Sequence, residues 1–258
     1  MKILLRKTLS EQEETDAAAQ YFPVIESRMD VEAGDLIVPR YSSLPYYDEL
    51  ERDVLKRGAT LINTYKQHKW IANFEWYDCL RRYTFDSWDM STIAKAPPDI
   101  AYVVKGKTNS KKWQWNRHMY AKNREEAVRM GCDLYTDGLI GSQGIIFRRF
   151  EKLNTFEIGV NGLPFSNEFR FFFLRDKLVD SGYYWSIAED LPSKVPADCT
   201  SLAKKVAGIA AEHANFFVLD IAQREGGDWV LVEINCGTMS GLSCIEPDSF
   251  YRNLKCSI

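Results

Sequence analysis

No apolar run in the sequence approaches the ~20 residues that a membrane-spanning helix needs. The opening residues, MKILLRKTLSEQEE, turn acidic after one short apolar run and offer no small-residue cleavage site, so no signal peptide is expected. The six cysteines have no short paired spacing. We therefore expect no zinc site, mostly buried thiols and a reducing compartment. Together these features predict a soluble cytoplasmic protein.

Neither sign of charge dominates, since 33 lysines and arginines face 36 aspartates and glutamates. Any surface that binds phosphate or nucleic acid must therefore be local. Only three histidines are present, and none lies in a recognisable nucleophile elbow, which argues against a Ser-His-Asp hydrolase. The 258 residues are sufficient for a substantial hydrophobic core.

Two common nucleotide-binding motifs are absent. Gly106-Lys107-Thr108 looks like the end of a P-loop, but Ala101 stands where that motif needs its first glycine. The lysine-x-aspartate/asparagine-glycine pattern of covalent nucleotidyl transferases is also missing. Neither a P-loop enzyme nor that class of ligase is indicated.

The N-terminal part, residues 1–95, is predicted to be a mixed α/β region, and residues 96–258 a second unit. The pattern indicates a strand at 35–40 and a helix at 42–58, with Ser43 as a possible cap and Gly58 as the stop. A further helical stretch is expected at 63–83. The segment KAPPD then interrupts the chain before a new strand.

Strands and helices alternate after residue 100, and strands dominate between 140 and 185, which predicts an α+β fold. One helix is expected to begin at the N-cap Asn123 and to end at Gly131. The other expected elements are strands at 100–105, 144–150, 216–222 and 229–235, hairpins turning at Asn161-Gly162 and Asp176-Lys177, and helices at 200–214 and 247–255.

Oxygen ligands gather near the C-terminus. Alternation along strand 229–235 places Leu231, Glu233 and Asn235 on one face. The tight turn REGGD makes the preceding strand an antiparallel neighbour, which brings Asp220 to the same region. Glu-x-Asn alone is more often a solvated sheet face, but Asp220 and the following glycine-rich CGTMSG favour a Mg²⁺ site.

Several cations precede this cluster. Lys105 ends a strand, where it either contacts phosphates or simply protects a hydrophobic strand from aggregation. Arg148 and Arg149 lie on opposite faces of their strand, so only one can face the site. Glu168 and Arg170 share a face, and a plain cross-strand ion pair is the alternative to a phosphate contact.

In chain order these residues resemble the ATP-grasp superfamily over roughly residues 95–245. The resemblance implies two α+β lobes that clamp ATP, with Mg²⁺ on the phosphates. Arg148 or Arg149 stands where many members have lysine or glutamine before the adenine-contacting hinge. The implied roles are metal binding by Asp220, Glu233 and Asn235, ATP contacts by Lys105, Lys107, Arg148, Arg149, Glu168 and Arg170, and catalysis by Lys105, Arg149, Arg170 and Glu233.

The segments VPRYSSLPYYDEL, LINTYKQHKWIANF and EINCGTMSGLSCIEPDSFYRNL are similar to a small phage-associated ATP-grasp clade. Members of that clade have been proposed as amide-forming ligases and, among RNA-repair genes, as RNA ligases. Aspartate often follows the Glu-x-Asn in that pattern, whereas this chain has Cys236.

The segment from Val103 to Arg124 is basic, has no acidic residue and interleaves aromatic side chains. Such a segment suits single-stranded nucleic acid, whose phosphates and bases it would contact. Alternatively, the tryptophans are core residues and the loop binds only ATP. The residues expected to contact nucleic acid are Lys111, Lys112, Trp113, Trp115 and Arg117, with Arg40, Arg81 and Arg82 extending the surface.

The leading hypothesis is an ATP- and Mg²⁺-dependent RNA ligase that joins a 5′-phosphate to a 3′-hydroxyl. The alternative is a carboxylate–amine ligase that activates its acid as an acyl phosphate and releases ADP. A binding protein with an inactive nucleotide site is disfavoured, because the predicted metal ligands are intact.

Overall fold

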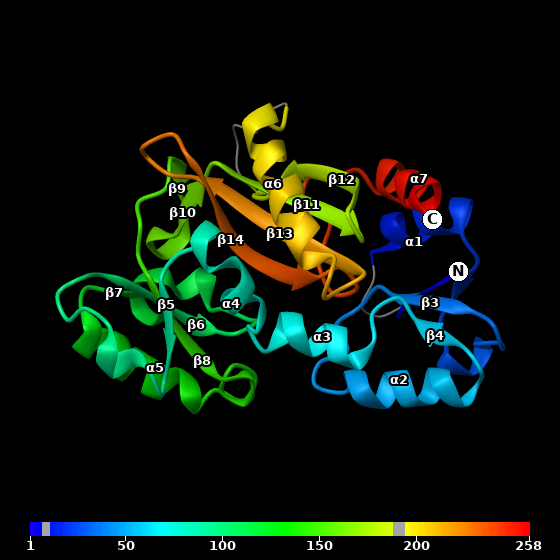
Figure 1. The fold of residues 1–258 in the computed structure, drawn as a ribbon, viewed down its shortest axis with the longest axis horizontal. Coiled ribbons are helices and arrows are strands. Elements are labelled where there is room, and N and C mark those ends of the chain that lie inside the picture. Colours follow the sequence, from blue (N-terminus) through cyan, green and yellow to red (C-terminus); the bar gives the residue numbers. More distant parts are fainter. Residues whose placement is uncertain (7–10, 188–193) are drawn as a thin grey trace.

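The computed structural model describes residues 1–6, 11–187 and 194–258 and shows three packed parts in a row (Figure 1). A small lobe with a four-stranded antiparallel sheet lies at one end, and the N-terminal unit at the other. A large lobe, built on a second four-stranded antiparallel sheet, lies between them. This mixture of sheets and helices confirms the α+β class.

The N-terminal unit is a parallel sheet in the order β2-β1-β3-β4. Parallel neighbours need crossover connections, which its helices supply. Gly58 has φ +74° directly after the last turn of α2, so the predicted stop is confirmed. Ser43 is not the cap, because α2 begins later and its N-cap, Tyr46, makes no side-chain bond. The elements are β1 Lys2–Leu4, α1 Gln12–Tyr21, β2 Val24–Ile25, β3 Leu36–Pro39, α2 Tyr47–Lys56 and β4 Thr60–Leu61.

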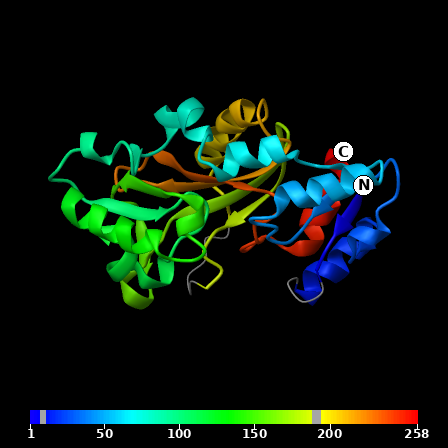
Figure 2. The same ribbon diagram turned by 90° about the horizontal axis from the view of Figure 1, so that it is seen from below.

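The helical stretch predicted at 63–83 is broken in two. Phe74 adopts φ 67°, a left-handed conformation that no helix accommodates, and its ring packs on Trp76 and Tyr77. The pieces are α3 Tyr65–Ala72 and α4 Trp76–Leu80, followed by a short 3₁₀ turn at Arg81–Tyr83. Figure 2 shows α3, in cyan, passing from the N-terminal unit to the large lobe.

The small-lobe sheet has the order β5-β8-β6-β7, and α5 covers the face that points away from the large lobe (Figure 1). Asn123 accepts a hydrogen bond from the Glu126 amide at 2.9 Å, which confirms the predicted N-cap. The predicted end at Gly131 is wrong, because α5 continues and Gly131 lies directly against the Phe147 ring. The elements are β5 Ser87–Asp89, β6 Tyr102–Gly106, β7 Tyr120–Ala121, α5 Arg124–Tyr135 and β8 Ile145–Arg149.

The boundary near residue 95 stays a prediction. The structure shows that β5, which precedes residue 95, pairs with β8 in the small-lobe sheet. The chain therefore enters the small lobe before the segment KAPPD that suggested the boundary.

The large-lobe sheet has the order β12-β11-β13-β14. Its first hairpin turns at Arg175-Asp176, one residue before the predicted position, because Leu174 already pairs with Lys177. Asn161 and Gly162 both have positive φ, as expected of the predicted hairpin turn. The elements are β9 Thr155–Ile158, β10 Pro164–Ser166, β11 Glu168–Leu174, β12 Lys177–Tyr183, α6 Ala197–Ala210, β13 Phe216–Gln223, β14 Trp229–Cys236 and α7 Pro247–Ser257.

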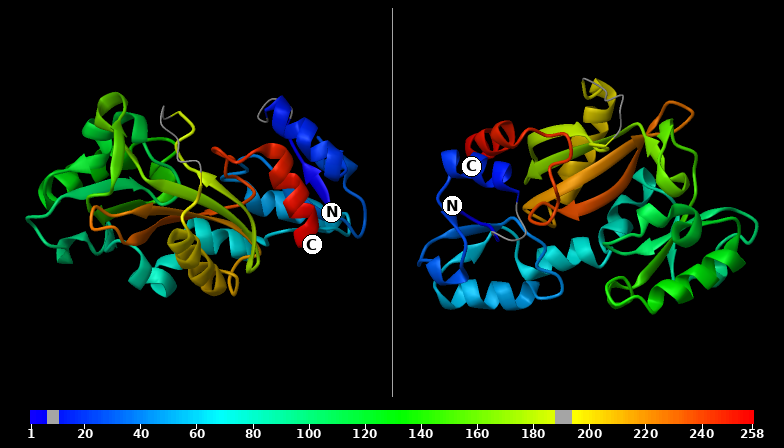
Figure 3. Two further views of the ribbon diagram at one scale, coloured as in Figure 1. Left: turned by 90° about the horizontal axis from the view of Figure 1, so that it is seen from above. Right: turned by 180° about the vertical axis from the view of Figure 1, so that it is seen from behind.

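The two faces of the large-lobe sheet have different neighbours. One face is largely apolar and forms a core with α6, α3 and α4. The other face is divided between two environments. Its Phe172 and Val218 end packs on the N-terminal unit and α7, which lies beside α1 (Figure 3). Its other end carries Glu168, Arg170 and Asp220, all buried, where the small lobe approaches.

The prediction of mostly buried cysteines is wrong. Cys199 and Cys236 are buried and Cys244 is half-buried, but the remaining three are exposed. Two of the exposed cysteines, Cys132 and Cys256, lie on the outer faces of α5 and α7, so their helical position decides their exposure. In the part of the chain that the structure describes, no helix is long and apolar enough to cross a membrane.

We expect Gly131→Ala to destabilise the protein by ~1–3 kcal/mol through overpacking. A Cβ at this position would lie 2.6 Å from Cζ of Phe147. Gly208→Ala is the matched control, since that exposed helical glycine has no atom within 4 Å of the added carbon. It should stabilise α6 by ~0.5–1 kcal/mol. Urea unfolding of both variants measures the difference, and equal effects would contradict the packing role of Gly131.

Candidate active site

A β-bulge in β14 shapes the site. Asp220 pairs with Glu233 but Ile221 pairs with Leu231, so Val232 is an extra residue on β14. Bulges interrupt the alternation of side chains and re-aim those that follow. The prediction that Leu231 shares a face with Glu233 is therefore wrong, and Leu231 packs in the core on the opposite face.

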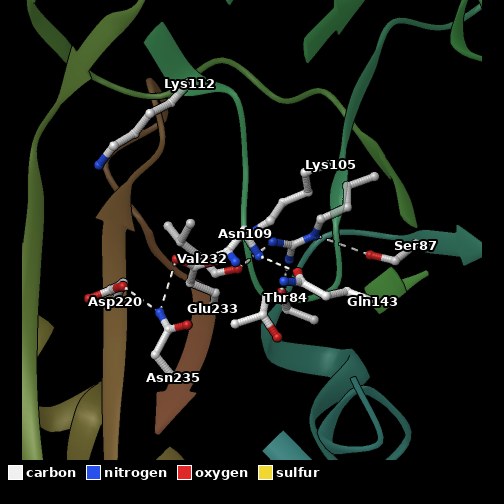
Figure 4. Close-up of polar contacts among 12 residues, drawn as sticks. Thr84, Ser87, Lys105, Asn109, Lys112, Gln143, Asp220, Val232, Glu233 and Asn235 are labelled. Carbon is white, nitrogen blue, oxygen red and sulfur yellow. Dashed lines mark hydrogen bonds and ion pairs between the residues drawn. The ribbon is translucent and has the colours of Figure 1, made fainter. Parts of the chain in front are cut away.

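Asp220, Glu233 and Asn235 come together, as the sequence predicted (Figure 4). The Asn235 amide nitrogen donates to Asp220 Oδ2 at 3.1 Å and to Glu233 Oε1 at 3.0 Å. Arg170 donates from Nε and Nη2 to both oxygens of Asp220, each at 2.8 Å, and from Nη1 to the Gly241 carbonyl. Asp220 is 0% exposed, so this two-bond pair compensates for a fully buried carboxylate.

Lys105 reaches this cluster from the small lobe. Its ammonium forms an ion pair with Glu233 Oε2, and the Lys105 residue is buried. Burial by itself would raise the pKa of Glu233, but Lys105, Asn235 and Arg170 together lower it to about 2. Glu233 is therefore a carboxylate at neutral pH. Its ion pair with Lys105 connects the large lobe to the small lobe.

Arg148 points towards β14, whereas Arg149 lies on the other side of its strand, near Asp86. The Arg148 guanidinium donates to the Val232 carbonyl, to Thr84 Oγ1 at 2.6 Å and to Ser87 Oγ at 3.2 Å (Figure 4). Burial lowers the pKa of Arg148 to about 10. Arg149 lies 3.2 Å from Asp86 at the half-exposed edge. The structure therefore places Arg148 next to β14, while Arg149 lines the cavity between the lobes, and its role in ATP binding and catalysis stays a prediction.

A cavity of about 350 Å³ lies between the two lobes. Its walls are largely apolar or aromatic, which suits a flat base such as adenine. Charged groups border it on the side of the carboxylates. The lining residues that matter here are Phe85, Trp115 and Leu163 among the apolar ones, and Lys105, Arg148 and Glu233 among the charged ones. We call this the first cavity.

A second cavity of about 320 Å³ adjoins the first, and we call it the acceptor cavity. The two share Ser110, Lys112, Tyr184 and Glu233, so these residues lie at their junction. The acceptor cavity is more polar. Its walls include His68 from α3, Asn109 from the loop after β6, and Arg170, Asn235 and Gly241 from the large lobe.

Glu168 borders the first cavity and is buried. It accepts a hydrogen bond from Ser166 Oγ at 3.0 Å. Burial, followed by repulsion from Asp220, raises the pKa of Glu168 to about 8. This carboxyl group can therefore carry a proton near neutral pH, which was not foreseen from the sequence.

A family model described as ATP-grasp domain, R2K clade family 3, matches residues 91–254. The chain belongs to this ATP-grasp family. It is accordingly an ATP-grasp ligase-type enzyme, and such ligases use ATP and Mg²⁺.

Solved ATP-grasp proteins share the fold at low identity. The RimK-domain ATP-grasp protein of Sphaerobacter thermophilus DSM 20745 has TM-score 0.60 and 11% identity, covering 98% of this chain and 99% of that chain. D-alanyl-alanine synthetase A of Vibrio cholerae O1 biovar eltor str. N16961 has TM-score 0.59 and 14% identity, with 98% and 96% covered. The ATP-grasp ligase PsnB with minimal precursor, Mg and ADP has TM-score 0.52 and 10% identity, with 92% and 90% covered. No curated protein sequence matches the chain.

The ATP-grasp site can hold Mg²⁺ through the predicted residues, with one restriction. Both oxygens of Asp220 are used by Arg170, so Glu233 and Asn235 are the better placed ligands. Mg²⁺ commonly binds one or two protein oxygens and takes its other ligands from water and phosphate, which fits this pair. Lys105 would have to leave Glu233, and Asn235 would present its oxygen. Among the described residues, no group of three histidine, cysteine, aspartate or glutamate side chains is arranged for a metal.

The basic segment after β6 does not form one surface. Lys111 pairs with Asp137 at 2.7 Å, and Lys112 points into the two cavities. Trp115 packs against the large-lobe core, whereas Trp113 is 50% exposed. Arg117 is exposed as well. The five predicted nucleic-acid contacts therefore have different environments.

Two further predicted cations lie away from the carboxylates. Arg40, predicted to extend the basic surface, is buried and pairs with Glu14 at 2.9 Å. It therefore offers no exposed charge to a nucleic acid. Lys107 follows β6, and its backbone amide donates to the Gly144 carbonyl at 3.0 Å. Its role as an ATP contact remains a prediction.

Two residues at the site, His68 and Tyr184, were missed in the sequence. Tyr184 accepts a hydrogen bond from Lys112 at 3.1 Å, and its ring stacks on Arg170. No local motif marks it. His68 and Ile71 are three residues apart on α3 and are both buried, so helical periodicity carries a weak signal for His68.

We expect the free energy of unfolding to fall as pH rises from about 5 to 8, by at most ~1.4 kcal/mol per pH unit for this group. In that range the folded state binds more protons than the unfolded state, because the pKa of Glu168 is raised from 4.5 to about 8. Glu168→Gln should flatten the dependence, while exposed Glu212→Gln should leave it unchanged. Urea unfolding at several pH values measures the slopes. An unchanged slope in Glu168→Gln would contradict the assignment.

Proposed function

We propose that this ATP-grasp enzyme is a carboxylate–amine ligase that activates its acid as an acyl phosphate. The observation that carries the proposal is the pair of adjoining cavities that meet at Glu233 and Lys112. The first cavity suits the nucleotide base, and the acceptor cavity has the polar walls that a small acid needs. The terminal phosphate of ATP would lie at their junction.

The reaction has two steps. A carboxylate oxygen of the acid attacks the γ-phosphorus of ATP, the bond to the β–γ bridging oxygen breaks, and ADP leaves. The amine nitrogen then attacks the acyl carbon, the amide forms, phosphate leaves, and the amine proton passes to solvent. Mg²⁺ held by Glu233 and Asn235 would offset negative charge on the phosphates.

The side chains around the junction match these steps. Lys105, Lys112 and Arg170 bring three positive charges to the place where phosphoryl oxygens would carry negative charge. Among the described residues, no carboxylate forms an ion pair with Lys112. Burial lowers the pKa of its ammonium group, because no close carboxylate compensates for the loss of water. An anion between the cavities would supply that missing partner.

The neighbouring structures support this choice over RNA ligation. One is named D-alanyl-alanine synthetase and another D-cycloserine synthetase, and PsnB is a ligase solved with a precursor. Their identities of 10–14% show only the shared fold, so the substrate class remains our proposal.

RNA ligation is the second candidate, and one observation favours it. Trp113 exposes half of its surface, and Arg117 is exposed nearby in the same segment. An RNA base could stack on Trp113. The inward positions of Lys112 and Trp115 leave this surface smaller than the sequence suggested.

Glu233→Gln should lower ADP formation at least ~100-fold, because it removes the charge that binds Lys105 and would bind Mg²⁺. The assay supplies ATP, Mg²⁺, a panel of carboxylic acids and hydroxylamine, which traps an acyl phosphate as a hydroxamate. Glu212→Gln, in the exposed turn after α6, is the matched control and should keep wild-type rates. Undiminished hydroxamate formation by folded Glu233→Gln would refute the assigned role.

The same protein, incubated with 5′-phosphorylated single-stranded RNA and labelled ATP, should leave the RNA unjoined and release no AMP. Joined RNA with AMP release would establish the RNA ligase instead. In that case Trp113→Ala should weaken RNA binding by ~1–3 kcal/mol and leave ATP binding unchanged. A salt titration of RNA affinity would then count the phosphate contacts.

A further inference from the structure

His68 has hydrogen-bonding groups that the chain does not use. The residue is 3% exposed and lines the acceptor cavity. Neither ring nitrogen is hydrogen-bonded to another residue in the ranges that the structure describes, and Nδ1 is fully enclosed. Buried polar atoms in native proteins nearly always have partners, so an unpaired imidazole at a cavity wall indicates a ligand contact.

The ring of His68 is held in place. The Tyr47 ring stacks on it with centroids 4.1 Å apart and planes 4° from parallel. Tyr47 is itself fully buried and donates its hydroxyl proton to the Asn63 carbonyl at 2.8 Å. A capping box between Thr64 and Gln67 fixes the first turn of α3, just before His68. Such a preorganised group can select a ligand without first having to be ordered.

The acceptor cavity has one region that suits an anion and another that suits an uncharged polar group. Arg170 is paired with Asp220 and Glu233 with Lys105, whereas Lys112 forms no ion pair with a carboxylate of the described residues. Burial lowers the pKa of His68 to about 4, so the imidazole is neutral at pH 7. Its Nε2, the ring nitrogen that is not fully enclosed, can donate or accept one hydrogen bond. Lys112 attracts an anion, while His68 suits an uncharged polar group.

We propose that the acceptor cavity binds a carboxylic acid that also carries a hydroxyl or amide group, and that His68 recognises this neutral group. The carboxylate lies beside Lys112 at the junction with the first cavity. This inference rests on the proposed ligase function, because it assigns the acid to the acceptor cavity. An acid with a plain alkyl chain would leave the imidazole unpaired, and a cationic chain would be repelled by Lys112.

The variants are chosen to separate hydrogen bonding from packing. His68→Phe keeps an aromatic ring to stack on Tyr47 but has no hydrogen-bonding atoms, and His68→Gln restores a donor and an acceptor. His213→Phe is the matched control, since His213 also stacks on an aromatic ring, Trp70, at 4.7 Å and 15°. It does not line the acceptor cavity. Thermal unfolding and near-ultraviolet circular dichroism verify that each variant folds.

The probes are matched acids, butyrate against 4-hydroxybutyrate and valerate against succinamate. The affinity of each acid is measured by calorimetry with Mg²⁺ and a non-hydrolysable ATP analogue. Turnover is measured with ATP as ADP release in the presence of hydroxylamine, which traps the acyl phosphate. Wild-type protein should bind the hydroxyl or amide member at least ~10-fold more tightly than its alkyl partner. His68→Phe should erase this preference without changing nucleotide affinity, His68→Gln should retain part of it, and His213→Phe all of it.

The outcomes distinguish the two proposals. If the binding preference for the hydroxyl or amide acid depends on His68 but no ADP is released, the ligase function is refuted and the binding assignment stands. ADP release with an unchanged preference in folded His68→Phe would do the reverse. If no acid binds in any variant, the assignment of the acceptor cavity is overturned as well.

Discussion

The buried pair of Arg170 and Asp220 is the interaction on which the site depends. The two residues lie opposite each other on β11 and β13, the central strands of the large-lobe sheet. A fully buried carboxylate is costly unless it is paired and hydrogen-bonded, and Asp220 receives two bonds from Arg170 and one from Asn235. Removing either charge would leave the other buried without compensation. This pair therefore limits which substitutions the active centre can tolerate.

The neighbouring strand, β14, is the place where the two lobes meet. The bulge at Val232 turns its carbonyl towards Arg148, and the next residue, Glu233, meets Lys105. Both cations come from the central strands of the small-lobe sheet, β8 and β6. Two successive residues of one strand thus hold the small lobe against the large one. A nucleotide in the first cavity would contact the same side chains, so binding and lobe contact are coupled through them.

The N-terminal unit contributes more than a scaffold. Its core extends under Phe172 and Val218 of the large-lobe sheet and reaches α7, so the two ends of the chain form one hydrophobic cluster. Arg40 fixes this arrangement through Glu14 and the Gly237 carbonyl. The segment after this unit then carries His68 to the wall of the acceptor cavity.

Sequence alone determined the features that depend on neighbouring residues and strand period. Asn123 as a cap, Gly58 as a stop and the turn at Asn161-Gly162 all follow from local backbone preferences. The short turn allows only an antiparallel connection, which brings Asp220 close to strand β14, but its direct pairing with Glu233 also requires the bulge at Val232. The resemblance to the ATP-grasp superfamily, which the family model confirms, rested on the order of these residues.

Tertiary structure decided the remainder, because it depends on what lies across from each segment. No particular residue type marks the bulge at Val232 in the sequence. The placement of Leu231 on the face opposite Glu233 could therefore not be predicted from the alternation. A basic segment with tryptophans looks the same whether it faces solvent or folds inward. Packing turned Lys112 and Trp115 inward and left Trp113 outside. The burial of His68 likewise exists only because α3 packs against Tyr47 on one side and the large lobe on the other.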